Sequence, residues 1–140
     1  MIECRTMAGA ERLDAFALMK HFREEAALGD ALALFVDRPD YGFVWLAYDD
    51  GIPAGCVSVA FAISTEAGGL AASLHDVWVA PDRRRRGIGT ALLVTLHGRL
   101  DQLGVTRMEA TIAPDEALQA FFASLHYAAS DATRATLRRR

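Results

Sequence analysis

The chain has 140 residues and a formal net charge of −3, which fits one domain over residues 1–140. A hydrophobic share of 52% and a charged share of 24% exclude intrinsic disorder as the dominant state. The acidic balance disfavours a nucleic acid as the main partner. The two cysteines and four scattered histidines match neither a disulfide framework nor a zinc motif, so we expect no metal.

The sequence shows neither a membrane-spanning pattern nor a signal-peptide pattern. No apolar run approaches the ~18 residues that would cross a bilayer. Glu3 and Arg5 stand where the apolar stretch of a signal peptide would begin. We therefore expect no membrane partner and a cytoplasmic protein with reduced thiols.

The first half of the chain is expected to form one helix and several strands. The helix covers residues 11–28, where apolar residues recur at helical spacing until Gly29 and Asp30 end it. Residues 31–36 fit either a strand or a short helix. Strand patterns, in chain order, cover residues 2–7, 42–48, 54–63 and 70–79. The second and third of these strands are expected to form an antiparallel hairpin.

The second half changes to a helical rhythm. We expect a helix over residues 87–103, a strand over 107–112 and a second helix that Asp115 can cap. Residues 127–129 and 132–137 could form a terminal hairpin. The strand–helix–strand order over residues 70–112 indicates a βαβ unit, and the whole order predicts a mixed α/β sheet with helices on both faces.

The most informative segment is residues 74–90, where a strand leads through four arginines into a helix. Gly87 and Gly89 carry no side chain that would block the unpaired N–H groups of the helix start, which can bind an anion. The arginines match phosphate geometry, so the segment predicts a diphosphate site. A dinucleotide fingerprint and a P-loop both fail, because Leu92 replaces the third glycine and no Gly-Lys-Ser/Thr is present. The alternative for the arginine run is a solvated surface or a nucleic-acid patch.

Three stretches of the chain carry a family resemblance. The run Arg84-Arg85-Arg86-Gly87-Ile88-Gly89 resembles the acyl-CoA-binding motif of the GCN5-related N-acetyltransferase (GNAT) superfamily, commonly Gln/Arg-x-x-Gly-x-Gly/Ala. The preceding Asp76-Val77-Trp78-Val79-Ala80-Pro81 resembles the fourth strand of that superfamily. Residues 115–127 resemble its second motif, and the separation of the motifs also fits.

The resemblance implies a fold, a reaction and a set of binding residues. The fold is a single α/β GNAT-like domain whose mixed, mostly antiparallel sheet has six to seven strands, helices on both faces, and splayed strands 4 and 5. The reaction is transfer of an acetyl group from acetyl-CoA, without a metal, to an amine of a small molecule or peptide by direct attack on the thioester. Family members are often dimers, so a homodimer is a further expectation. The implied cofactor-binding residues are Val77, Trp78, Val79, Arg84, Arg85, Arg86, Gly87, Ile88, Gly89, Thr90, Asp115 and Phe122.

The resemblance assigns the catalytic residues less completely. Asp76 falls where the family often has an acid, so it is the candidate for binding or deprotonating the amine; the alternative is a hydrogen bond within the fold. Histidine as a residue type titrates at ~6.5 and suits the role of a base, but alternation along a strand points His75 away from Asp76 and favours a structural role. The family's proton-donating tyrosine falls on Phe122, which cannot donate a proton. No general acid is identified, so solvent or another group would protonate the thiolate.

These departures leave a second function open. Phe122 and Asp115, which replace the family's Tyr and Asn, favour a domain that binds acyl-CoA for sensing without turnover. Four aromatic residues could line an acceptor pocket, although their strand spacing is more typical of a core: Phe43, Trp45, Phe61 and Trp78. The sequence does not identify the acceptor.

Overall fold

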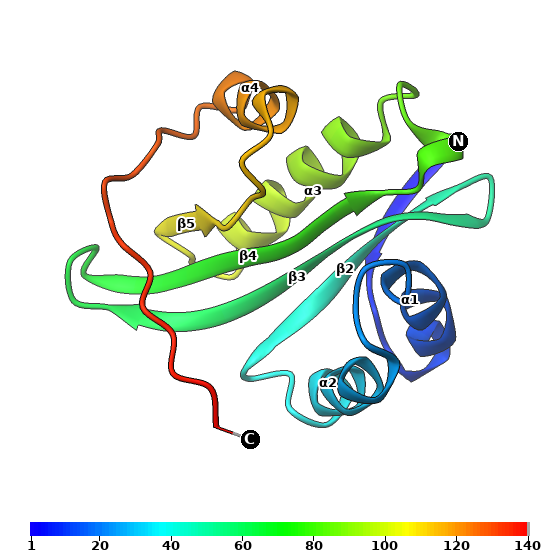
Figure 1. Ribbon diagram of the computed structural model, residues 1–140, viewed down its shortest axis with the longest axis horizontal. Coiled ribbons are helices and arrows are strands. Elements are labelled where there is room, and N and C mark those ends of the chain that lie inside the picture. Colours follow the sequence, from blue (N-terminus) through cyan, green and yellow to red (C-terminus); the bar gives the residue numbers. More distant parts are fainter. Residues whose placement is uncertain (140) are drawn as a thin grey trace.

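The computed structural model describes residues 1–139, which form one five-stranded sheet with four α-helices (Figure 1). In order across the sheet, the strands are β1 (Ile2–Thr6), β2 (Gly42–Asp49), β3 (Ile52–Ser64), β4 (Gly69–Val79) and β5 (Arg107–Ala110). The helices are α1 (Arg12–Met19), α2 (Glu25–Asp37), α3 (Ile88–Gln102) and α4 (Glu116–Ser124). Neighbouring strands from β1 to β4 are antiparallel, and β4 pairs with β5 in parallel across the α3 crossover. The expected mixed, mostly antiparallel sheet and the βαβ unit are therefore confirmed.

The prediction of six to seven strands is wrong, because the segment after α4 adds no strand within the described residues. The expected hairpin over residues 127–129 and 132–137 is absent there, and residues 128–139 are all exposed. In Figure 1 this segment passes in front of the sheet toward α2. Its residues are mostly small or charged, and its one large apolar side chain, Leu137, is 80% exposed. Such a sequence buries too little apolar surface to offset the entropy of ordering a strand.

The single helix expected over residues 11–28 is also wrong, since two helices cover this region. Helix α1 ends at Met19, and α2 begins at Glu25, so Gly29 and Asp30 lie inside α2. The carboxylate of Glu24 accepts hydrogen bonds from the N–H groups of Ala26 at 3.0 Å and Ala27 at 2.8 Å. This N-cap starts a new helix, and packing of its apolar face outweighs the ~1 kcal/mol that a glycine costs inside it. Residues 31–36, which fitted either structure, are helical.

The two faces of the sheet carry separate cores. Alternate residues of the fully buried β2 divide between them: Phe43 and Trp45 face α3 and α4, whereas Val44 and Leu46 face α1 and α2. Helix α3 contributes a buried stripe to the first core, made of Ile88, Leu92, Leu93, Leu96 and Leu100. Helices on both faces are therefore confirmed, and Phe43 and Trp45 are core residues.

Strand β4 bulges at Asp76, and its pairing with β5 ends nearby. Cys56 opposes Trp78 and Ser58 opposes His75, so two residues of β4 face Val57 alone. Asp76 adopts a left-handed conformation with φ of 56°, and such a bulge bends the strand and re-aims its side chains. Pairing between β4 and β5 ends at Leu74, five residues before β4 itself ends. Pairing stops there because β5 ends at Ala110, and beyond this point a pocket lies between β4 and the chain that follows β5; the splay that the resemblance implies stays a prediction.

Candidate functional site

The loop between β4 and α3 exposes main-chain N–H groups at a helix start. Arg85 and Gly87 both adopt left-handed conformations, with φ of 65° and 78°, just before α3 begins at Ile88. The first turn of a helix has N–H groups without helical partners, and left-handed residues next to it curve the chain into an anion-binding concavity. The predicted diphosphate site therefore has a suitable backbone. Only Gly87 meets its positive φ without a steric cost, because Arg85 carries a Cβ.

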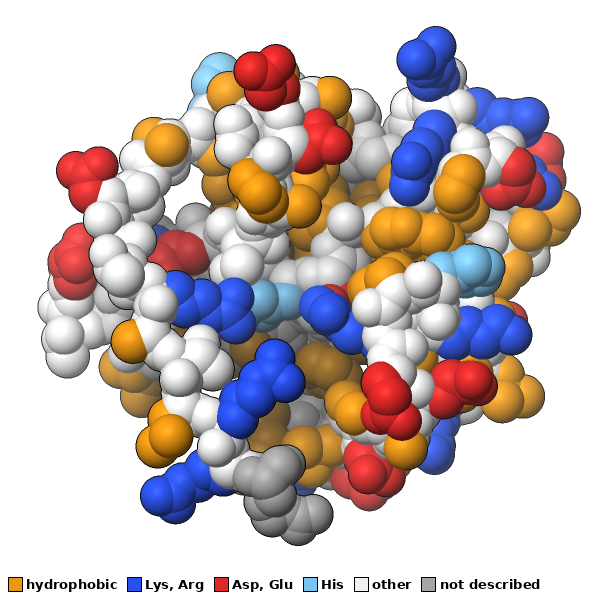
Figure 2. All heavy atoms as spheres, in the orientation of Figure 1, with side chains coloured by type: hydrophobic (Ala, Val, Ile, Leu, Met, Phe, Trp, Pro, Cys, Tyr) orange, Lys and Arg blue, Asp and Glu red, His pale blue; other side chains and the backbone are white. Residues whose placement is uncertain are grey.

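The arginines of this loop also hold it in place. A guanidinium N–H of Arg83 donates to Asp49 at the end of β2 at 3.0 Å, and Arg86 lies 3.6 Å from the same carboxylate. Arg84 donates from Nε to the carbonyl oxygen of Val79 at 2.9 Å. Arg84, Arg85 and Arg86 nevertheless remain exposed, and basic side chains gather over this corner of the molecule at the upper right of Figure 2. The arginine run therefore both shapes the loop and surrounds it with positive charge.

A pocket of about 260 Å³ lies between β4 and the chain that follows β5, and we call it the strand-gap pocket. It is lined by Phe22, Arg23, Asp76, Val77, Trp78, Thr111, Ile112, Ala113 and Leu118. Trp78 stacks on His21 with ring centroids 5.3 Å apart and lies 5.4 Å from the ring of Phe22. Unlike Phe43 and Trp45, Trp78 is therefore a wall of the candidate site.

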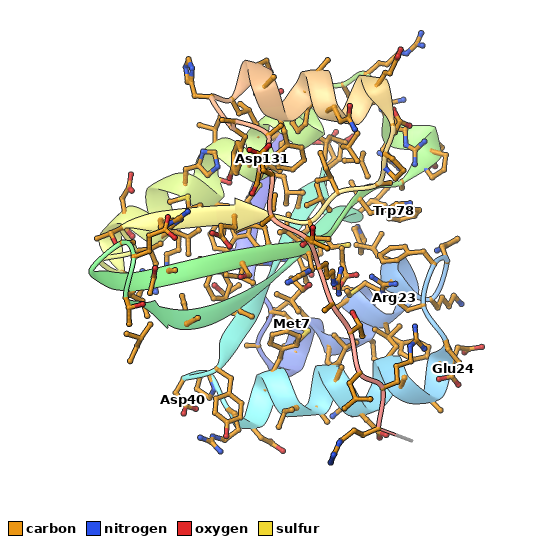
Figure 3. The ribbon with its side chains drawn as sticks, turned by 60° about the vertical axis from the view of Figure 1, so that its left-hand side comes forward. Met7, Arg23, Glu24, Asp40, Trp78 and Asp131 are labelled. Carbon is orange, nitrogen blue, oxygen red and sulfur yellow. The ribbon has the colours of Figure 1, made fainter. Side chains whose placement is uncertain are left out.

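A second pocket, of about 200 Å³, lies between β4 and the two N-terminal helices, and we call it the helix-side pocket. It is lined by Met19, Arg23, Glu24, Ala27, Leu28, Ala31, Leu32, Phe35 and Asp76. Arg23 and Asp76 line both pockets, so the two hollows meet at this pair of side chains. Figure 3 shows Arg23 on the connection between α1 and α2, beside Trp78 and above Glu24 at the start of α2.

Asp76 is the centre of a polar network between the pockets. Its Oδ1 accepts hydrogen bonds from Nε of Arg23 at 2.9 Å and from Nη2 of the same guanidinium. Its Oδ2 accepts a hydrogen bond from the hydroxyl of Ser58 at 2.7 Å. The Asp76 side chain is 14% exposed, whereas that of Arg23 is 55% exposed. Asp76 is therefore fixed in orientation and still reaches both pockets.

The other candidate catalytic side chains lie away from the pockets. His75 is half-buried and is not among the residues that line either hollow. Phe122 is 3% exposed and packs edge-to-face against Phe121 and Tyr127, with centroids 5.6 Å and 5.0 Å away. The Tyr127 hydroxyl lies 2.8 Å from Nε2 of His97. Burial raises the pKa of Tyr127 to about 12. The structure therefore brings neither Phe122 nor Tyr127 to the meeting point of the pockets.

The contacts of Asp115 and the burial of Cys56 indicate structural roles. Asp115 accepts hydrogen bonds from the N–H groups of Ala117 at 2.8 Å and Leu118 at 3.1 Å, which caps α4 as expected. Cys56 is fully buried, and burial raises the pKa of its thiol.

Within residues 1–139, no three His, Cys, Asp or Glu side chains are grouped so that they could hold a metal ion. In the same range, no helix has the length and apolar composition needed to cross a bilayer.

Arg23 and the α2 side of the site were not predicted from the sequence. Arg23 lies 53 positions from Asp76 in the chain, and no motif connects them. The available signal was Glu24, an acidic residue that can cap the helix following it. Recognising that cap would have broken the single predicted helix and placed Arg23 on a turn.

A family model described as "Acetyltransferase (GNAT) family" matches residues 10–127 of the chain. Among curated proteins, none matches its sequence significantly. The family match therefore comes from a pattern spread over most of the chain.

Solved structures share the fold at low sequence identity. An integron cassette protein from the mobile metagenome of Cole Harbour Salt Marsh has a TM-score of 0.84 at 22% identity, covering 96% of this chain and 89% of its own. A ribosomal-protein-alanine N-acetyltransferase from Brucella melitensis biovar Abortus 2308 has a TM-score of 0.78 at 15% identity, covering 99% of both chains. The aminoglycoside N-acetyltransferase AAC(6')-Iy in complex with CoA has a TM-score of 0.78 at 16% identity, covering 100% of this chain and 95% of its own. These likenesses concern the fold.

Proposed function

The chain belongs to the acetyltransferase (GNAT) family, and we propose that it transfers an acetyl group from acetyl-CoA to an amine of a small molecule or peptide. One observation carries the proposal. The strand-gap pocket opens beside β4, and the loop that leaves the end of β4 presents the unpaired N–H groups of α3. An acyl-CoA has both parts that this arrangement suits, an extended amide-bearing arm and a diphosphate.

The residues of the loop and the gap fit acetyl-CoA. In the proposed complex the diphosphate accepts hydrogen bonds from N–H groups of residues 85–90, with the three exposed arginines adding positive charge. A Cβ at Gly89 would lie 3.6 Å from the ring of Phe121 and 3.8 Å from Val79, so there is little room for a larger side chain here. The pantetheine arm would pair with main-chain groups of Val77 and Val79 and lie against Trp78.

The proposed reaction needs an amine that has lost its ammonium proton. The amine nitrogen attacks the thioester carbonyl carbon, the N–C bond forms, the C–S bond breaks, and CoA leaves as the thiolate. Asp76 accepts the amine proton, directly or through a water molecule, and its network with Arg23 and Ser58 orients it for that role. Because Phe122 has no proton to give and Tyr127 is held by His97, solvent protonates the thiolate.

Two measurements on the wild-type protein test this function. Free-thiol release from acetyl-CoA, recorded with a panel of primary amines, should rise above the hydrolysis rate for at least one acceptor. Calorimetric titration with CoA should show binding at one site per chain. CoA binding without thiol release for any amine would instead support a binding module without turnover, and absence of CoA binding would contradict both functions.

A further inference from the structure

The helix-side pocket has two carboxylates, of which only Asp76 also lines the strand-gap pocket. The charged lining residues of the helix-side pocket are Arg23, Glu24 and Asp76. The two carboxylate oxygens of Glu24 already accept the N–H groups of Ala26 and Ala27, and these backbone hydrogen bonds lower the pKa of Glu24. Glu24 therefore caps α2 as an exposed carboxylate, whereas Asp76 is the carboxylate that lines both pockets.

The hydrogen-bonding positions that remain unused on Arg23 and Asp76 indicate which polar groups a ligand should have. A carboxylate has about four lone-pair positions, and Asp76 already accepts three hydrogen bonds, two from Arg23 and one from Ser58. Room for about one further N–H donor remains. Arg23 donates to Asp76 only from Nε and Nη2, so the N–H groups of its Nη1 do not bind Asp76. About half of the Arg23 side chain is exposed. A guanidinium edge of this kind recognises a carboxylate.

The rest of the pocket is apolar and small. Leu28 and Leu32 are buried side chains of its lining, and the ring of Phe35 also lines it. Ala27 and Ala31 lie one helical turn apart on α2, where their short side chains leave the space open. Its volume of about 200 Å³ lies below the ~300–1,000 Å³ of pockets that hold drug-sized ligands. The pocket therefore suits a small apolar group.

We propose that the amine acceptor is a small amino acid-like molecule with one amine, one carboxylate and an apolar side chain. This inference rests on the proposed acetyl transfer and adds the chemical class of its acceptor. The amine lies at Asp76, next to the strand-gap pocket, and the carboxylate lies on the free edge of Arg23. The side chain enters the hollow between Leu28, Ala31 and Phe35. A polycationic acceptor is disfavoured, because its additional ammonium groups are repelled by Arg23.

The test compares leucine with an analogue that lacks only its carboxylate charge and with a polycationic amine. L-leucine, L-leucinamide and spermidine are supplied with acetyl-CoA to the wild-type protein, and kcat/KM is measured by thiol release. Leucine should exceed leucinamide at least about tenfold, since a hydrogen bond to a charged group contributes ~1.5–3 kcal/mol and each 1.4 kcal/mol is tenfold. Leucinamide has the less basic amine and so more of the reactive neutral form, which means that a preference for leucine cannot come from amine reactivity. Spermidine should be the poorest acceptor.

Two variants connect this preference to the pocket. Arg23→Gln should remove the advantage of leucine over leucinamide. The matched control Arg99→Gln changes an exposed arginine on α3 whose partner is Gln102, and it should keep the advantage. Ala31→Phe should raise the KM for leucine at least about tenfold and leave glycine, which has no side chain, less affected. Calorimetric titration of leucine into the CoA-bound protein gives a readout that does not depend on turnover.

Distinct outcomes overturn the acceptor class and the function. Equal or better use of leucinamide or spermidine would overturn the acceptor class while leaving acetyl transfer intact. So would an Arg23→Gln variant that still prefers leucine. Binding of leucine without acetyl transfer would support the pocket assignment and contradict the proposed function.

Discussion

The loop before α3 and the helix-side pocket are built to recognise ligands by different means. The loop presents main-chain N–H groups from consecutive residues, and Arg83 and Arg86 tie it to Asp49. The helix-side pocket presents side chains from α1, α2, their connection and β4, and its polar part is the Arg23–Asp76 pair. Substitutions at the loop glycines should therefore act through shape, whereas substitutions at Arg23 and Asp76 should act through charge.

Removing the charge of Asp76 should give the largest loss of activity. Asp76→Asn keeps the size of the side chain, but it can no longer accept the amine proton. General-base catalysis contributes ~10²–10⁴-fold, so acetylation of the best acceptor should fall at least ~10²-fold. The affinity for CoA should stay within about threefold, because the diphosphate is held by the loop. Ser58→Ala, which removes one hydrogen bond and keeps the carboxylate, is the control and should cost less than tenfold. An active Asp76→Asn enzyme would show that Asp76 is only structural.

Bulk at Gly89 should weaken CoA binding through shape alone. The added methyl groups of Gly89→Val would press against Phe121 and Val79 and shift the start of α3 away from the diphosphate. A hydrogen bond to a charged group contributes ~1.5–3 kcal/mol, so the loss of one such bond to the diphosphate should raise the Kd measured by calorimetry about tenfold or more. Gly89→Ala, whose Cβ would be in ordinary contact, should change the Kd little. Unchanged affinity in a folded Gly89→Val protein would remove the loop from the binding site.

A hydroxyl added at Phe122 tests whether this position belongs to the site or to the core. The structure places Phe122 among Phe121, Tyr127 and the apolar face of α3, at 3% exposure. In Phe122→Tyr, a buried hydroxyl without a partner should lower the free energy of unfolding by ~1–3 kcal/mol. Turnover should not rise. Thermal melting and thiol release measured together decide the matter, and a faster variant of unchanged stability would place this ring next to the thioester.

The smallest expected effect concerns pH and the core beside α4. Burial lowers the pKa of His97, which shares a hydrogen bond with Tyr127, below its ordinary value of ~6.5. Between the folded and unfolded pKa values the unfolded chain binds more protons, so the contribution of His97 to stability is complete above pH ~6.5 and is lost as the pH falls. The melting temperature should therefore fall less between about pH 7.5 and 5.5 in His97→Gln than in the wild type. Parallel curves would assign the pH dependence to other groups.

The same division explains what the sequence could predict. The loop and its glycines are consecutive in the chain, so their spacing alone indicated a diphosphate site. Asp76 was implied by the resemblance of residues 76–81 to the family's fourth strand, but its bulge was not predicted, because a register shift depends on the pairing of β3 with β4. His75 and Asp76 were expected to point to opposite faces because alternation holds in a regular strand. The bulge at Asp76 interrupts that regularity.

The remaining differences between the predicted and the observed structure depend on contacts between residues far apart in the chain. Arg23 reaches Asp76 only because Glu24 starts a second helix and turns the chain between the two. The prediction of a terminal hairpin was wrong because residues 128–139, whose side chains are mostly small or charged, bury no apolar surface. These features depend on which surfaces the folded chain brings together.

The most direct test of the account is the melting temperature of the wild-type protein with and without CoA. At 100 times the dissociation constant, CoA should add ~2.7 kcal/mol to the free energy of unfolding. For a domain of this size that corresponds to a rise of roughly 10 °C. An unchanged melting temperature at millimolar CoA would contradict the assignment of the loop and the strand-gap pocket to acetyl-CoA.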